Sequence, residues 1–157
     1  MELERIKSKV TRILTDEFGA AEDSEDNHFI VSVQDSLLDL SFIVHRADTD
    51  DDDARIFIEV SSVICFDCPI SDELFAWIAL YGSNYLVGNV ALHTNGFDSL
   101  IEIKRVDEPR LTDIVFRYRM LGNDIDPSEI YVATYAVAES SRELRELIPG
   151  KFGGLPQ

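Results

Sequence analysis

Apolar and polar residues alternate along three neighbouring segments in the first half of the chain, and this pattern constrains the fold more than any other feature. Successive side chains of a β-strand point to opposite faces, so such alternation predicts strands with one strongly buried face. Gln34-Asp35-Ser36 is typical of a tight turn between the first two strands. The buried face is expected to contain Phe29, Val31, Val33, Leu38, Leu40, Phe42, Val44, Ile56, Ile58, Val60 and Ile64.

Three segments have the sequence signals of helices. Residues 2–18 carry apolar side chains at spacings of three and four, and Gly19 follows as a stop. The second helix is expected to begin after Ser71 as N-cap, and the third after Asp126 with Pro127 at its first position. The predicted apolar faces of the first and third helices are Leu3, Ile6, Val10, Ile13, Leu14, Phe18, Ile130, Tyr131, Val137, Leu144 and Leu147.

A second β-rich stretch lies between the last two helices. We expect strands at about 85–93, 98–106 and 111–120, with Asn95-Gly96 as a hairpin signal between the first two. The segment 20–27 is expected to be an acidic loop, and Pro149-Gly150 to end the third helix. The sequence thus predicts a single α+β domain over 1–148, in the order α-β-β-β-α-β-β-β-α, with an antiparallel sheet of about five to six strands and three helices. Residues 149–157 are expected to form a flexible tail.

The charge of the chain narrows its range of partners. Thirty acidic residues stand against fourteen basic ones, a formal net charge of −16, which repels phosphate backbones and anionic membrane surfaces. No segment is apolar for long enough to span a bilayer, and the charged start lacks the apolar core of a signal peptide. With only two cysteines, a disulfide scaffold is not expected. We therefore expect a cytoplasmic protein with no nucleic-acid or membrane partner.

Cys65-x-x-Cys68 lies between a predicted strand and a predicted helix, which is a position where redox-active cysteines occur. A redox pair needs a thiolate that is stabilised at a helix N-terminus. Here Pro69 and the cap Ser71 hold both sulfurs a few residues short of the helix, and Asp67 disfavours a thiolate. Two reduced, partly buried cysteines are the favoured interpretation, and a thiol redox or sensing role is the alternative.

Metal sites receive little support. Zinc would need more ligands than the two cysteines provide, and His28, His45 and His93 are scattered singly on probable strands. The acidic run at 48–53 resembles a calcium loop, but Asp53 replaces the required glycine and Glu59 falls inside a strand. A solvated acidic hairpin tip is the favoured interpretation of the run. No metal or other cofactor is expected.

Motifs for catalysis are lacking as well: the sequence has no G-x-S-x-G, no H-E-x-x-H and no phosphate-binding glycine loop. Carboxylate pairs carry little information on so acidic a chain. No catalytic residue is therefore assigned, and the chain is expected not to be an enzyme.

The face of the sheet opposite to the predicted core, called the second face below, is part apolar. Alternation places Ile30, Ile43, Phe57 and Val63 on it. Apolar residues on a nominally solvent-facing surface indicate that something covers it, and another helix, a second subunit and a bound peptide remain open. These four residues are the candidate binding residues for a peptide or partner protein.

Three short stretches resemble a known group of proteins when taken in order. They are D-E-L-F-A-W-I-A at 72–79, N-Y-L-V-G-N-V at 84–90 and L-G-N-D-I-D-P-S-E-I at 121–130. Together they resemble the YbjN-like and type III secretion chaperone-like (TY-Chap type) families of small bacterial proteins, over residues 29–147. The sequence departs from the family pattern in two places. The stretch 94–111 is longer than in the family and leaves room for an added strand, and Ile125 replaces the family's more usual apolar residue within the last motif.

The resemblance implies a secretion-chaperone-like α+β fold, frequent homodimerisation, and a role in holding a peptide or partner protein in the bacterial cytoplasm. It implies no catalytic residues. An acidic chain with a part-apolar second face suits an amphipathic or basic partner. The functional hypothesis is therefore a non-enzymatic peptide- or protein-binding module, and a regulatory domain would differ from it only in the partner that is bound.

Overall fold

The computed structural model describes residues 2–19, 22–24, 28–45, 55–93 and 110–157. The first half contains α1 (Glu2–Phe18), β1 (Glu22–Ser24), β2 (His28–Val33), β3 (Ser36–His45) and β4 (Arg55–Pro69). The second half contains α2 (Asp72–Tyr81), β5 (Asn89–His93), β6 (Leu111–Leu121), α4 (Pro127–Phe152) and β7 (Leu155–Pro156). The predicted acidic run at 48–53, the hairpin signal Asn95-Gly96 and the predicted strand at 98–106 lie outside the described residues.

The strands form one antiparallel sheet in the order β1-β2-β3-β4-β6-β5, and β7 pairs with β4 outside this path. The predicted α+β class with an antiparallel sheet is confirmed. β4 is the longest strand: β3 pairs with it on one edge, β6 on the other, and β7 joins where β3 no longer reaches. The short β1 pairs with β2, so residues 22–24 are a strand rather than part of the loop expected there.

The hairpin between β2 and β3 follows the predicted turn. Gln34 and Asp35 have φ values of 50° and 63°, and Val33 pairs directly with Ser36. Two consecutive residues with positive φ are the signature of the type I′ turn, whose twist matches that of the flanking strands. The turn fixes the register, and alternate residues of both strands are buried as predicted.

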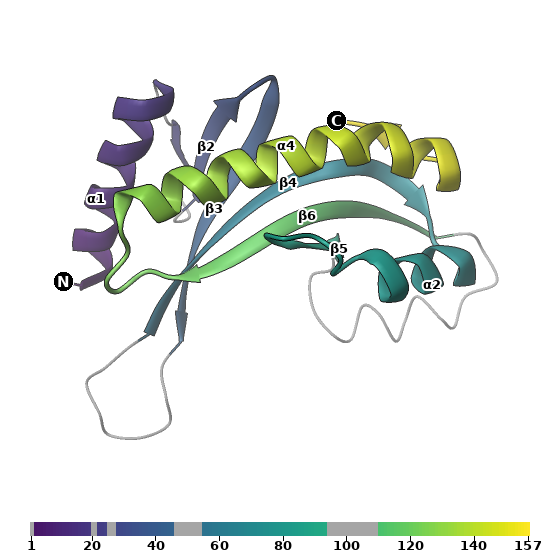
Figure 1. The fold of residues 1–157 in the computed structure, drawn as a ribbon, viewed down its shortest axis with the longest axis horizontal. Coiled ribbons are helices and arrows are strands. Elements are labelled where there is room, and N and C mark those ends of the chain that lie inside the picture. The colour runs from purple at the N-terminus through teal and green to yellow at the C-terminus, as the bar shows by residue number, and fades with distance from the viewer. Residues whose placement is uncertain (1, 20–21, 25–27, 46–54, 94–109) are drawn as a thin grey trace.

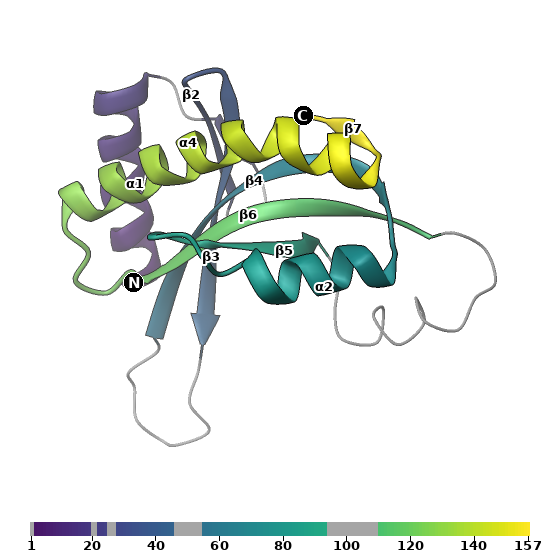
Figure 2. The same ribbon diagram turned by 45° about the vertical axis from the view of Figure 1, so that its right-hand side comes forward.

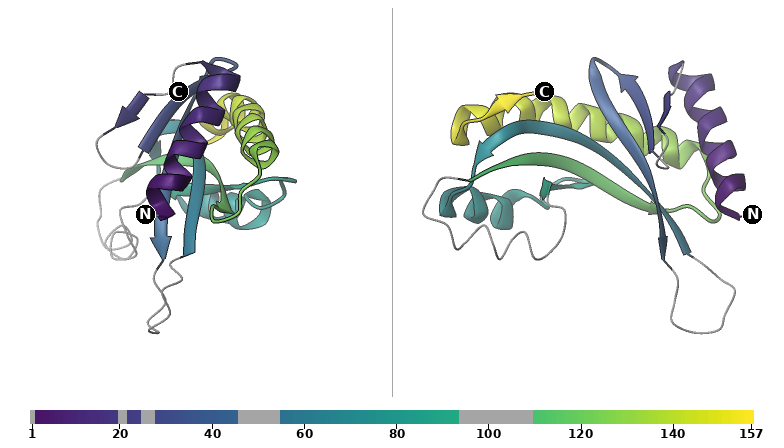
Figure 3. Two further views of the ribbon diagram at one scale, coloured as in Figure 1. Left: turned by 90° about the vertical axis from the view of Figure 1, so that its left-hand side faces the viewer. Right: turned by 180° about the vertical axis from the view of Figure 1, so that it is seen from behind.

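All three described helices lie on one side of the sheet. α4 crosses β4, β3 and β6, and α1 stands across its N-terminal end (Figure 1). α2 lies beside β5 at the other end (Figure 2). Its Trp77 contacts Phe152 of α4, with ring centroids 5.9 Å apart. Seen from behind, the strands lie in front of α4, so the second face is turned away from the helices (Figure 3).

The helix caps are as predicted. The Ser71 hydroxyl accepts a hydrogen bond from the Leu74 amide at 3.1 Å. Asp126 accepts one from the Ser128 amide at 2.8 Å, and its own amide donates to the Glu129 carboxylate at 2.9 Å. Such reciprocal bonds satisfy N-terminal amides that have no partner within a helix.

The core residues of the helices are predicted only in part. Ile6, Val10, Ile13 and Leu14 of α1 are buried, whereas Leu3 and Phe18 are partly buried. On α4 the prediction was wrong for Tyr131 and Leu147, which are exposed while Ile148 is buried. Val44 is also exposed, because it lies near the end of β3 beyond the helices. Residues 85–88 are not part of β5, which begins at Asn89.

The expectation of a flexible tail at 149–157 was wrong. α4 continues through Pro149 to Phe152, because the buried Ile148 and the contact between Phe152 and Trp77 stabilise the last turn against the loss of one amide donor. Leu155 and Pro156 then pair with Phe66 and Cys65, as β7. The Gln157 side chain accepts a hydrogen bond from the Ser62 hydroxyl at 3.3 Å, so tertiary contacts hold this end against the sheet.

Candidate functional site

The second face carries all four predicted binding residues, and each of them is half-buried. Only two are neighbours. Ile43 lies directly opposite Phe57 on the adjacent strand, whereas Ile30 lies opposite Asp39, and Val63 lies opposite Val115 on β6. The structure therefore brings Ile43 and Phe57 together and leaves Ile30 and Val63 apart from them.

Leu121 extends the Ile43–Phe57 pair across a third strand. It lies opposite Phe57 in the register of β4 and β6, and half of it is exposed. Side chains directly opposite in antiparallel strands approach to within contact distance, so Ile43, Phe57 and Leu121 form one continuous row, called the apolar row below. The prediction missed Leu121 because the strand was expected to end at residue 120.

Leu37 is another exposed apolar residue that the prediction missed on this face. It is 51% exposed and shares the parity of Asp39 and Ile43 on β3. Alternation traced back from Ile43 to the turn would have found it. Leu37 lies at the opposite end of β3 from the apolar row, so it is not part of that row.

A polar band crosses the second face next to the apolar row. Arg119 on β6 donates to the Glu59 carboxylate on β4 at 2.6 Å, and His28 on β2 lies 3.0 Å from the Asp39 carboxylate on β3. Glu59 and Arg119 face each other across the two strands, as opposite charges do favourably. The second face thus presents an apolar row bordered by ion-paired side chains, a pattern suited to an amphipathic segment.

The cysteine pair lies at an irregular stretch of β4. The register with β6 shifts on both sides of Cys65, and Asp67 has a φ of 50°. Cys65 and Cys68 are both fully buried, and the Cys65 thiol donates to the carbonyl oxygen of Gly153 at 3.3 Å. Burial, followed by the nearby Cys68, raises the pKa of the Cys65 thiol from 9.0 to about 12, and burial also raises the pKa of Cys68. Neither sulfur is disposed to act as a thiolate nucleophile.

The histidines lie at strand ends and are not drawn together. His28 begins β2, His45 ends β3 and His93 ends β5. Within the described ranges no group of three or more His, Cys, Asp or Glu side chains is placed to hold a metal ion.

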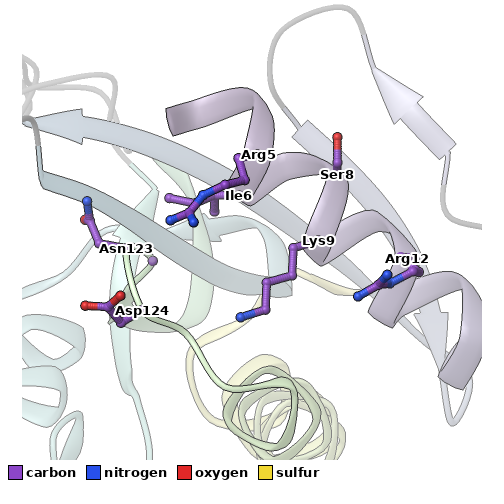
Figure 4. Close-up of a pocket in the computed structure, with 8 residues that line it drawn as sticks. Arg5, Ile6, Ser8, Lys9, Arg12, Asn123 and Asp124 are labelled. Atoms are coloured by element: carbon purple, nitrogen blue, oxygen red, sulfur yellow. The ribbon is translucent and has the colours of Figure 1, made fainter. Parts of the chain in front are cut away.

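A pocket of about 610 Å³ lies between α1 and the β6–α4 connection. Arg5, Lys9 and Arg12 project from α1 toward the segment that carries Asn123 and Asp124 (Figure 4). The chain itself engages two of these cations, since Arg5 pairs with Glu2 at 2.6 Å and Lys9 donates to the carbonyl oxygen of Ile125.

The polar groups of the connection are engaged in the same way. The Asn123 side-chain oxygen accepts from the Ile56 amide at 2.9 Å, which ties the connection to β4. The contacts around this pocket thus hold α1, the connection and β4 together. They account for the presence of a local basic cluster on an acidic chain.

Arg145 of α4 is a half-buried cation beside the β2–β3 hairpin. Its guanidinium donates to the hydroxyl of Ser36 at 2.5 Å, and burial lowers its pKa. In the described part of the chain, the Nε atom of Arg145 and the hydroxyl of the neighbouring Ser141 are buried without a hydrogen-bond partner. The cluster joins α4 to the hairpin at a cost in unsatisfied polar groups.

Comparisons with known proteins place the fold but not a family. No family model matches this sequence, and no curated protein matches it. The chain is similar in structure to an uncharacterized protein from Methanothermobacter thermautotrophicus, solved by crystallography, with 15% sequence identity and a TM-score of 0.51. The match covers 94% of this chain and 99% of the archaeal one.

No helix in the described ranges is both long and apolar enough to cross a bilayer. At 15% identity, the archaeal likeness supports a shared fold and carries no activity from one chain to the other. The described helices and strands thus make this chain an α+β protein with an antiparallel sheet, of a fold that it shares with an archaeal protein.

Proposed function

We propose that this chain is a non-catalytic cytoplasmic module that binds an amphipathic segment of a partner protein on the second face of its sheet. The observation that carries the proposal is the apolar row of Ile43, Phe57 and Leu121, which runs across three adjacent strands. The second face is turned away from the described helices (Figure 3), and Leu121 is half exposed. Apolar side chains held in register on a rigid sheet suit apolar side chains of a bound segment.

The charge of the chain defines the rest of the partner. A net charge of −16 attracts a segment whose remaining residues are basic. Since Glu59 is paired with Arg119 beside the apolar row, the attraction comes from the acidic surface as a whole. The proposed ligand is therefore a segment in which apolar residues face the row and lysine or arginine residues face solvent.

The resemblance to the YbjN-like and secretion chaperone-like families supports the same role, because those proteins hold peptides or partner proteins. We include homodimerisation, which the resemblance also implies, in the proposal. The alternative of a thiol redox protein has no supporting observation: both cysteines are buried, and their raised pKa values disfavour the thiolate.

A synthetic peptide of alternating leucine and lysine, labelled with a fluorophore, tests the proposal by fluorescence anisotropy. We expect the protein to bind it and to bind a leucine–glutamate peptide much less. The Ile43→Asp/Phe57→Asp double variant should weaken binding by on the order of tenfold or more. Leu121→Asp, at a half-exposed position, should do the same with less risk to the fold.

Leu147→Asp is the matched control, since Leu147 is also half exposed but lies on α4, on the helix side of the sheet. Its affinity for the peptide should equal that of the wild type. If the leucine–lysine peptide does not bind, or if Leu121→Asp and the folded double variant bind it as well as the control, the second face is not the binding surface.

A further inference from the structure

The second face carries another group of apolar side chains, at the opposite end of the strands from the apolar row. Leu37 on β3 and Val63 on β4 both lie on this face. Asp39 pairs with Ser61, and the same register continued by two residues brings Leu37 opposite Val63. The Ser62 hydroxyl donates to the Leu37 carbonyl oxygen at 3.1 Å, which holds the two strands together at this end.

The pairing of β7 with β4 adds two more apolar side chains to this group. Phe66 follows the buried Cys65, so it points to the second face, and Leu155 of β7 lies directly opposite Phe66. Phe66 is 37% exposed and Leu155 is 63% exposed. The Gln157 amide donates to the carbonyl oxygen of Leu37 at 3.4 Å, so β7 is joined to β3 as well. We call the group the distal patch, and its members are Leu37, Val63, Phe66 and Leu155.

The distal patch lies about 20 Å from the apolar row, because six residues of β4 separate Phe57 from Val63 and a strand rises about 3.3 Å per residue. Between these two residues, Glu59 and Ser61 of the polar band face the same side. An extended segment that lies along the strands has the same two-residue repeat as β4. Two of its residues six positions apart would therefore meet the apolar row and the distal patch together.

Arg117 on β6 lies between the two apolar groups. It is half-buried, opposite Ser61 on one side and Asn89 on the other. The charged side chains of the polar band already described are paired with each other. Within the ranges that the structure describes, the Arg117 side chain forms no hydrogen bond or ion pair. A cation without a partner on so acidic a chain is placed to receive a carboxylate from a bound segment.

We infer that the second face binds one extended segment of the partner along its strands, held at both the apolar row and the distal patch, with a carboxylate between them on Arg117. The inference rests on the proposed function and names the sequence pattern of its ligand. Two apolar residues six positions apart face the sheet, and an acidic residue faces it four positions from the one on the apolar row. Lysine or arginine residues occupy the solvent-facing positions in between, where the net charge of −16 attracts them.

Two-site binding is tested by fluorescence anisotropy with the labelled peptide Leu-Lys-Ser-Lys-Glu-Lys-Leu and its reversed sequence, which covers the opposite direction along the sheet. Leu-Lys-Glu-Lys-Leu-Lys has the same net charge but leucines only four positions apart. The longer spacing, in one of the two directions, should bind on the order of tenfold more tightly. Leu37→Asp and Leu155→Asp, both at exposed positions, should each remove this advantage, and Leu147→Asp on α4 should preserve it.

The role of Arg117 is tested by replacing the peptide's glutamate with glutamine. This change should weaken binding to the wild type by on the order of fivefold, although it makes the peptide more attractive to an acidic chain. The Arg117→Gln protein should bind both peptides equally. Arg142→Gln is the matched control, because it removes the same charge from an exposed position on α4, and it should keep the preference for glutamate. Equal preferences in Arg117→Gln and Arg142→Gln would overturn the assignment of the carboxylate to Arg117.

The remaining outcomes separate the inference from the proposed function. If none of these peptides binds, and the leucine–lysine peptide does not bind either, the two fail together. If the short spacing binds as tightly as both long ones, or if the advantage of the long spacing survives in Leu37→Asp and Leu155→Asp, the distal patch is not a contact site. Binding that is then still lost in Leu121→Asp would leave the proposed function standing on the apolar row alone.

Discussion

Gly154 lies so close to Cys65 that a methyl group on Gly154 would overlap the sulfur atom and approach the backbone of Phe66 and Cys68. Its φ of +95° is also in the region that favours glycine. Gly154 thus allows the chain to leave α4, pass over the cysteine pair and enter β7. The contact joins the end of the longest helix to the most irregular part of the sheet.

Gly154→Ala should therefore destabilise the protein by about 2 kcal/mol or more, since both the backbone strain and the overlap oppose it. The free energy of unfolding in urea is the measurement. Gly150→Ala is the matched control: Gly150 lies in α4 with open space around it, so alanine should leave stability unchanged or raise it by up to about 1 kcal/mol. Equal effects of the two substitutions would contradict the contact.

The two thiols should resist alkylation in the folded protein. Both are buried and both have raised pKa values, so iodoacetamide at pH 8 should modify them only when the chain opens locally or unfolds. Mass spectrometry over time provides the readout, with the urea-unfolded protein as the fast reference. Rapid labelling of the native protein would show that β7 and Gly154 do not shield the pair.

Stability should also decrease at alkaline pH because of these thiols. The folded pKa of Cys65, about 12, lies above its ordinary value of 9.0, so the unfolded chain loses this proton first as pH rises. The stabilisation is complete below pH 9 and is lost between pH 9 and about 12. Urea midpoints at pH 7, 9 and 10 should decrease in that order, and the decrease should be smaller in Cys65→Ala. Parallel curves for the two proteins would argue against a raised pKa at Cys65.

Two serine-to-alanine substitutions should act in opposite directions at the Arg145 cluster. Ser141 is fully buried and its hydroxyl has no partner, so Ser141→Ala should leave stability unchanged or raise it by about 1 kcal/mol. Ser36→Ala removes the acceptor of the Arg145 guanidinium and should cost about 1–3 kcal/mol. Thermal unfolding of both variants under the same conditions is the comparison. Similar losses would mean that Ser141 has a partner in solution.

The strands and helix caps were predictable because their signals are local. Alternation fixes which residues share a face once the strand exists, and the capping residues Ser71 and Asp126 bond within their own first turns. The end of α4 was mispredicted for the opposite reason. Pro149 and Gly150 are typical breakers, but a contact with Trp77, distant in sequence, stabilises the turn that follows them.

The candidate site was predictable to the same limited extent. The alternation of side chains along each strand placed Ile43 and Phe57 on one face. Only the pairing of β4 with β6 shows that Leu121 completes their row and that Val63 does not. Leu155 joins the distal patch only through the pairing of β7 with β4, in a stretch that was expected to be a flexible tail.

The pairing of β7 with β4 has a consequence for the order in which the protein folds. β4 pairs with β3, which lies close to it in the sequence. Cys65 and Phe66 of β4, in contrast, pair with Pro156 and Leu155 from the far end of the chain. Closing so long a loop costs entropy before any contact repays it, and such non-local pairings slow folding. The cysteine pair is therefore expected to be the last part of the sheet to be enclosed during folding, and the interval before β7 docks is when its thiols meet solvent.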